Sequence, residues 1–144
     1  MRRWWLCIPL VILGACSAFV VPSMFTAMDR SRQNRTMADI RSIATAIEAY
    51  ETDHPDWKPA RRGYFSGELT PLLAPMYLKT MPVKDGWDHP YHVALWTIGD
   101  GASYRIWSLG KDGKRDAAWG GFTTNFNRDI VYEQGTFTQV PEGT

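Results

Sequence analysis

An uncharged stretch near the N-terminus limits what this chain can fold into more than any other feature. After two arginines, no charged residue occurs from Trp4 to Met28. About 20 apolar residues are enough to cross a bilayer as a helix, and a membrane helix tolerates proline better than a helix exposed to water does. We therefore predict that residues 1–28 form a hydrophobic membrane anchor.

The same stretch permits a second interpretation, a lipoprotein-type signal. Leu13-Gly14-Ala15-Cys16 follows two arginines and a short apolar segment, which is the order of parts in a signal that is cleaved before a cysteine. Cleavage would leave Cys16 as a lipidated N-terminus and would remove the spanning helix. Cys16 is therefore a candidate lipidation site, and both interpretations attach the chain to a membrane.

An amphipathic pattern follows the uncharged stretch. Apolar residues recur at steps of three and four, which is typical of a helix with one side facing a core. These residues are Met37, Ile40, Ile43, Ala44, Ile47 and Tyr50. His54-Pro55 ends the pattern, because the residue before a proline is pushed out of the helical conformation. Residues 4–52 are thus predicted to be one long helix, kinked at its prolines.

The rest of the chain predicts a small antiparallel sheet. Four segments have the length and residue types of strands: 91–98, 103–109, 129–132 and 136–140. Gly99-Asp100-Gly101 is a hairpin signal between the first two, and Gly135 lies between the last two. A short interrupted helix is predicted over residues 67–78. Two segments are predicted to be irregular loops: 55–65 and 111–128.

Four blocks of sequence occur in a characteristic order: PSMFTAMDRSRQNRTMADIRSIATAIEAYETDH, LAPMYLKTMPVKDGWDHPY, YRIWSLGKDG and NFNRDIVYEQGTFTQVPEG. Together they resemble the type IV pilin-like proteins and, within them, the major pseudopilin family of type II secretion, protein G. The resemblance covers roughly residues 20 to 142. It implies an α+β, pilin-like fold, in which a long N-terminal membrane helix packs on a small antiparallel β-sheet. The pilin-like globular domain is expected over residues 29–144, including the C-terminal half of the helix.

The resemblance implies a structural subunit without enzymatic activity. Its expected partners are other pseudopilin or pilin subunits, the secretion machinery and the membrane. The expected location is the bacterial inner membrane, with the globular domain in the periplasm. The alternative is a membrane lipoprotein, lipidated at Cys16, that uses its pilin-like domain as a binding or accessory module.

The start of the chain departs from the family pattern. Trp4-Trp5-Leu6-Cys7 stands where the family has its prepilin cleavage motif and a glutamate. That glutamate is thought to pair with a neighbouring subunit inside the membrane, where only a partner charge compensates its desolvation. We therefore expect this chain not to restore long pseudopili in place of a major pseudopilin.

A calcium site is also expected from the resemblance, between SLGKDG and NFNRD. Calcium binds six to eight oxygen atoms from carboxylates, amides and backbone carbonyls, usually on a flexible loop. The candidate ligands are the Leu109 carbonyl, Asp112, Asn125, Asn127 and Asp129. The alternative is a glycine-rich loop that Asx turns hold without a metal.

Composition argues against several other functions. Sixteen basic and fifteen acidic residues leave a net charge of +1, which supplies no basic field for nucleic acid. No serine or histidine stands in a recognisable arrangement for nucleophilic catalysis. His89 and His92 are predicted to be surface histidines rather than metal ligands. The seven tryptophans are expected to be core and interface residues.

Overall fold

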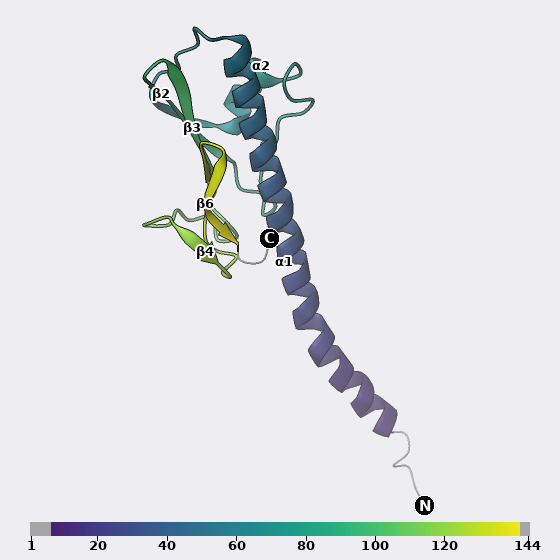
Figure 1. Cartoon of the computed structure of the whole chain (residues 1–144). Helices are drawn as coiled ribbons and strands as arrows, with labels where there is room; N and C mark the ends of the chain where they lie inside the picture. The colour runs from purple at the N-terminus through teal and green to yellow at the C-terminus, as the bar shows by residue number, and fades with distance from the viewer. Residues whose placement is uncertain (1–6, 142–144) are drawn as a thin grey trace, which may run out of the picture. The chain divides into compact units, whose positions relative to one another are not determined.

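A computed structural model describes the backbone of residues 7–141 and the side chains of residues 23–141. The chain divides into two units, Met1–Ser31 and Arg32–Thr144. The first element, α1, runs from Cys7 to Asp53, and the sheet follows it in the second unit (Figure 1). The prediction of one long helix is confirmed from Cys7 onward, since the α-helical backbone continues through Pro22; its first predicted residues, 4–6, lie outside the described residues.

The predicted membrane anchor, residues 1–28, lies mostly outside the residues whose side chains the structure describes. The same holds for the candidate lipidation site Cys16 and for the sequence that stands in place of the cleavage motif. Within the described part of the chain, no helix combines the length and the apolar character needed to cross a membrane. Met24, Phe25 and Met28 are described, and all three side chains are exposed.

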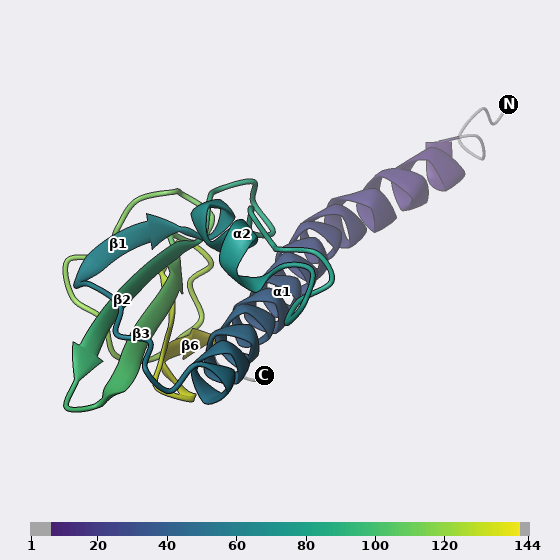
Figure 2. The same cartoon turned by 90° about the horizontal axis from the view of Figure 1, so that it is seen from above.

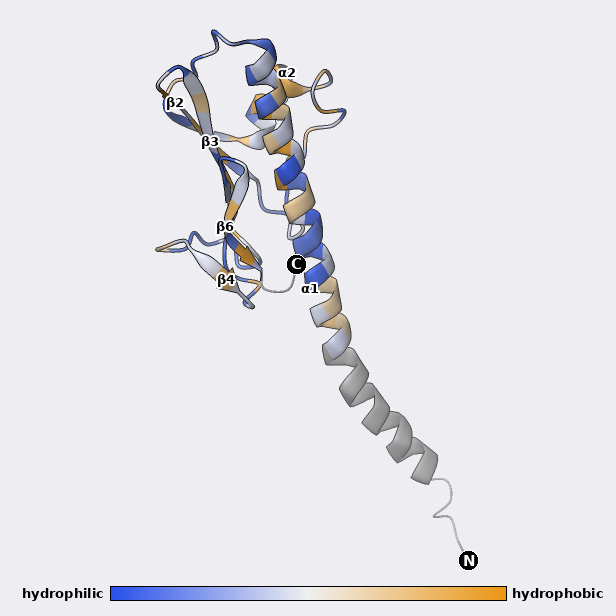
Figure 3. Cartoon of the chain, viewed as in Figure 1, coloured by the Kyte–Doolittle hydropathy of each residue, from blue (hydrophilic) through white to orange (hydrophobic). Residues whose placement is uncertain are grey.

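In the second unit, α1 buries one side against the sheet. Five of the six predicted apolar residues are buried there, and Tyr50 is half-buried. The buried ones are Met37, Ile40, Ile43, Ala44 and Ile47. Polar residues between them, such as Arg41 and Glu48, are exposed. Figure 3 shows this alternation of hydrophobic and hydrophilic residues along the helix. The helix ends at Asp53, directly before His54-Pro55, as predicted.

The sheet has six strands: β1 (Arg62–Phe65), β2 (His92–Ile98), β3 (Gly101–Ser108), β4 (Gly121–Thr123), β5 (Ile130–Glu133) and β6 (Thr136–Pro141). Their order is β1-β2-β3-β5-β6-β4. All neighbours are antiparallel except β4 and β6. Figures 1 and 2 show the sheet along one side of the C-terminal part of α1. The predicted α+β, pilin-like fold class is therefore confirmed, with a sheet that is mixed rather than wholly antiparallel.

The two edge strands of the sheet, β1 and β4, come from segments predicted to be loops. β1 lies in the 55–65 segment and β4 in the 111–128 segment. Each is short, and most of its residues are exposed, so neither has the alternation of apolar and polar residues that identifies a strand. The predicted helix over residues 67–78 is also shorter, comprising a 3-10 turn η2 (Ser66–Leu69) and α2 (Thr70–Leu73).

The two faces of the sheet have different side chains. Successive residues of a strand point to opposite faces, and on β2 Val93 and Leu95 are buried while Ala94 and Trp96 are half-buried. The face toward α1 is mainly aliphatic and forms one core with the helix. The opposite face, which we call the outer face, carries aromatic and arginine side chains of β2 and β3, among them Trp96 and Arg105.

Candidate functional site

The SLGKDG loop after β3 lies against the segment that leads into β5. The Lys111 amide donates a hydrogen bond to the Phe126 carbonyl at 2.9 Å. Gly110 has φ +65°, and a Cβ atom there would come within 2.5 Å of the Arg128 carbonyl oxygen. The backbones of the two predicted site segments therefore meet, at a position that requires glycine both for its φ angle and for the close approach.

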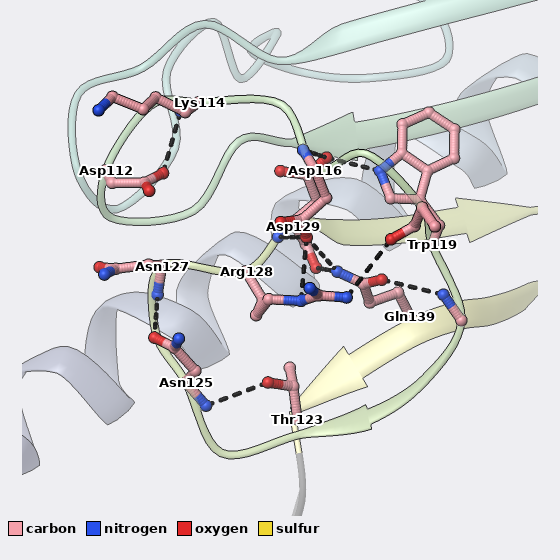
Figure 4. Close-up of polar contacts among 12 residues, drawn as sticks. Asp112, Lys114, Asp116, Trp119, Thr123, Asn125, Asn127, Arg128, Asp129 and Gln139 are labelled. Carbon is pink, nitrogen blue, oxygen red and sulfur yellow. Dashed lines mark hydrogen bonds and ion pairs between the residues drawn. The ribbon is translucent and has the colours of Figure 1, made fainter.

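The five candidate calcium ligands lie at different depths in this region. Asp129 is fully buried and Leu109 is half-buried, whereas Asp112, Asn125 and Asn127 are exposed. Asp112 Oδ1 accepts the Lys114 amide at 3.0 Å, and Asn125 Oδ1 accepts the Asn127 amide at 3.0 Å (Figure 4). These are Asx turns, the local hydrogen bonds by which such a loop keeps its shape.

Asp129 is the buried carboxylate of the site. Its Oδ2 atom accepts hydrogen bonds from the Trp119 indole at 2.6 Å and from the Asp116 amide at 3.2 Å. Its Oδ1 atom is buried and has no hydrogen-bond partner among the described residues. Burial raises the pKa of Asp129, while the hydrogen bond from Trp119 opposes that rise. A buried acceptor without a donor destabilises the fold, so a cation at Oδ1 would stabilise it.

Asp116 is a member of the site that the sequence analysis missed. Its Oδ2 atom accepts the Asp129 amide at 2.9 Å and the Gln139 side-chain amide at 2.7 Å. The same oxygen lies 3.2 Å from Arg128 Nε in an ion pair. Asp116 stands in the middle of a predicted loop, outside the two motifs on which the sequence analysis relied. Only its acidic character in a loop next to those motifs could have indicated it.

Gln139 on β6 is the second residue that was missed. It is almost fully buried, and its Nε2 atom also donates to the Asp129 carbonyl at 2.8 Å. Its Oε1 atom accepts the Gly120 amide at 2.9 Å. Its polar side chain within a predicted strand is the signal that could have identified it. We call Asp116, Trp119, Asp129 and Gln139 the polar cluster.

The two histidines of the sequence analysis take separate structural roles. His89 Nδ1 lies 2.8 Å from the Gly110 carbonyl oxygen and so contacts the same loop. His92 is half-buried, its Nε2 atom is buried, and its ring stacks on Trp107. Among the described residues, no group of three or more His, Cys, Asp and Glu side chains is placed to hold a metal ion.

A long helix packed on a small sheet, with a loop site beside the last strands, defines a pilin-like protein. More specifically, the chain belongs to the family described as Type II secretion system (T2SS), protein G, whose model matches residues 23–123. The prediction of a pseudopilin of type II secretion is therefore confirmed.

Several curated proteins named "Type II secretion system core protein G" are similar to this chain. The protein from Pseudomonas aeruginosa is 33% identical, over 72% of this chain and 77% of its own length. The protein from Xanthomonas campestris pv. campestris is 29% identical over 88% and 83%, and that from Escherichia coli 26% identical over 73% and 77%. No solved structure matches the chain. Nothing in these comparisons supports the lipoprotein alternative.

Proposed function

We propose that this chain is a non-catalytic structural subunit of a pseudopilus, and that it assembles with other pseudopilin subunits and with the secretion machinery. The observation that carries the proposal is the family match, which extends from Ser23 in α1 to Thr123 at the end of β4. It thus includes both the helix stripe and most of the sheet that this stripe packs on. Structural subunits of this kind act through packing surfaces rather than through an active site.

We propose further that the N-terminal part of α1 lies in the bacterial inner membrane, with the globular domain in the periplasm. Met24, Phe25 and Met28 support this, because their large apolar side chains are exposed along α1. A cluster of exposed apolar side chains marks a surface that contacts lipid or another protein. The equivalent helices of neighbouring subunits and the surrounding lipid would both cover it.

Cysteine crosslinking in membranes tests both proposals. Cys7 and Cys16 would first be replaced by serine, and Phe25→Cys would then be introduced into the full chain. In cells that express the secretion machinery, we expect Phe25→Cys to crosslink to a pseudopilin subunit, and the protein to stay in the membrane after a carbonate wash.

Asp112→Cys is the control, because Asp112 is also exposed but lies on a loop of the globular domain. Its labelling by a membrane-impermeant thiol reagent in intact spheroplasts would place the domain in the periplasm. The proposals fail if Phe25→Cys gives no crosslink to any pseudopilin and the protein is released by the wash.

We propose that the polar cluster and the loop beside it bind a calcium ion. The buried Oδ1 atom of Asp129 has no other partner in the described chain, and calcium prefers oxygen ligands of this kind. The Leu109 carbonyl and Asp112 would come from one segment, and the amide oxygens of Asn125 and Asn127 from the other. The ion would neutralise the buried carboxylate and would add a further connection between the two segments.

Thermal unfolding of the full chain in millimolar calcium and in chelator tests this site. An ion that binds only the folded state adds about 1.4 kcal/mol at a tenfold excess over its Kd, which raises the Tm of a domain of this size by several degrees. Asp112→Ala and Asp129→Asn should remove the increase. Asp56→Ala, which removes an exposed carboxylate elsewhere, should retain it. Equal Tm values of the unmodified chain in calcium and in chelator would refute the site.

A further inference from the structure

The outer face of the sheet has a hollow where β1 and β2 lie side by side. Gly63 on β1 pairs with Ala94 on β2, and both have small or absent side chains. The hollow measures about 280 Å³, and the side chains around it include Arg61, Trp96 and Arg105. A Cβ atom at Gly63 would have no neighbour within 4 Å, so the missing side chain of this glycine leaves the space open.

The charge around the hollow is positive. Arg105 is paired with Glu133, its Nη2 atom lying 2.9 Å from Glu133 Oε1. Arg61 is exposed and forms no ion pair within the described part of the chain, and the same is true of Arg115, which lies over the rings of Trp107 and Trp119. Of the three arginines that line the hollow, Arg105 is paired with Glu133 and Arg62 with Glu68. Arg61 therefore supplies the unpaired positive charge that is complementary to an anionic partner.

The side chains of the outer face are of the types that dominate protein interfaces. The Arg105 guanidinium lies 5.2 Å from the centre of the Trp119 ring and 5.9 Å from that of Trp96. Tryptophan and arginine are enriched among the residues that contribute most to binding between proteins. These stacked side chains are also held in place before any partner binds, which lowers the entropy lost on association.

β1 is an edge strand, so one of its sides has no strand beside it. The Ser66 amide points inward to the Tyr91 carbonyl, and the preceding Phe65 amide points outward, where Glu68 Oε1 accepts it at 2.8 Å. Backbone groups alternate along a strand, so the amide and carbonyl of Gly63 both face the free edge. An edge with unused donors and acceptors can accept a further strand.

We propose that β1 accepts an extended acidic segment of a partner protein as an additional strand. A carboxylate of that segment would occupy the hollow over Gly63 and bind the guanidinium of Arg61, which matches a carboxylate in shape and charge. A peptide is favoured over an anionic lipid because the free edge at Gly63 offers main-chain hydrogen bonds, which a lipid cannot complete in the same way. This interaction goes beyond the proposed structural role and does not require that a filament forms.

The experiment uses the full chain in a neutral detergent and a fluorescent eight-residue peptide of alternating glutamate and threonine. We expect this peptide to bind, and its affinity to fall as salt is raised. Two comparison peptides separate the two kinds of contact. One has glutamine in place of glutamate, and the other carries N-methyl groups on alternate backbone amides. The glutamine peptide lacks the ion pair with Arg61, and the N-methylated peptide lacks main-chain hydrogen bonds to β1. Each should therefore bind roughly tenfold more weakly than the acidic peptide.

Variants of the protein locate the binding. Arg61→Gln should weaken binding of the acidic peptide roughly tenfold, and Gly63→Val should abolish it by filling the hollow. Both positions are exposed, and the space at Gly63 is open, so both variants should unfold at nearly the same temperature as the unmodified chain. Lys79→Gln removes an equal charge from another exposed position and should leave the affinity unchanged.

The proposal would be overturned if the three peptides bound equally, or if Arg61→Gln bound as tightly as Lys79→Gln. A third outcome would also overturn it. If short-chain phosphatidylglycerol shifted the NMR signals of Gly63 and Arg61 while the acidic peptide did not, the hollow would bind a lipid headgroup rather than a protein segment.

Discussion

Two places in the globular domain bring distant parts of the chain together, and they do so by different physics. Between α1 and the sheet, the contact is aliphatic, and Ile40, Ile43 and Ile47 are at most 1% exposed. Around Asp129 and Gln139, the contact consists of directed hydrogen bonds between side chains and backbone. Apolar burial depends on area and not on direction, whereas a buried polar group is stable only with the right partner at the right angle.

This difference determines what each region tolerates. We call the aliphatic contact between α1 and the sheet the seam. When a side chain in the seam is replaced by an apolar one of another shape, its apolar neighbours can partly repack around it. In the polar cluster, each group satisfies a particular partner, so removing one group leaves another buried and unpaired. The seam therefore provides most of the stability, and the cluster fixes the arrangement of the loops. Four predictions test this division.

The largest effect is expected in the seam. Ile43→Ala removes a fully buried side chain from the centre of the helix stripe and should lower the free energy of unfolding by about 2–5 kcal/mol. Urea unfolding measures this. Ser42→Ala, on the exposed side of the same helix turn, should change the stability by less than about 0.5 kcal/mol. Similar losses in both variants would contradict the assignment of the stripe to the core.

The seam is also the region that the sequence predicted well. The stripe from Met37 to Ile47 has the helical period, and β2 and β3 have the alternation and the turn of a hairpin. These patterns can be seen in the sequence because each buried position favours an apolar residue, whatever its neighbours are. The edge strands β1 and β4 were missed because pairing with a neighbouring strand, rather than burial of their own side chains, makes them strands.

The candidate site was predicted only in part, for the same reason. Two motifs located the loops that meet at Gly110, and Asp129, one of the candidate ligands, lies beside them. Asp116 and Gln139 were missed, although both form hydrogen bonds with Asp129. Which donor meets which acceptor depends on the path of a long loop, and no period in the sequence encodes that path.

The second largest effect is expected where the two loops touch. Gly110→Ala places a Cβ atom 2.5 Å from the Arg128 carbonyl oxygen, at a residue with φ +65°. Gly135→Ala is the matched control, because Gly135 has φ +84° and open space around it. The control should lose about 1–2 kcal/mol from its backbone conformation alone. Gly110→Ala should lose about 1–3 kcal/mol more from overpacking, measured by urea unfolding. Equal losses would show that the loops do not touch at this point.

A smaller loss is expected from the polar cluster itself. Asp116→Ala removes the acceptor of the Asp129 amide and of the Gln139 side chain and should reduce the free energy of unfolding by about 1–3 kcal/mol. Asp112→Ala removes an exposed carboxylate that accepts a hydrogen bond from its own loop, and without calcium it should stay within about 0.5 kcal/mol of the unmodified chain. Hydrogen exchange should also show faster exchange of the Asp129 amide in Asp116→Ala. Unchanged exchange there would mean that Asp116 does not hold this segment.

The smallest effect is a pH dependence that comes from the outer face. Burial between Phe65 and Trp107, and secondarily the charge of Arg115, lower the pKa of His92 below its usual value near 6.5. The unfolded chain therefore binds a proton more readily than the folded protein does, and the unfolding free energy falls as pH drops below about 6.5. His92→Phe keeps an aromatic ring at this position without a titrating group. As the pH is lowered from 7 to 5, the unfolding free energy of His92→Phe should rise relative to that of the unmodified chain. A constant difference over this range would show that His92 titrates alike in both states, and that the outer face does not desolvate it.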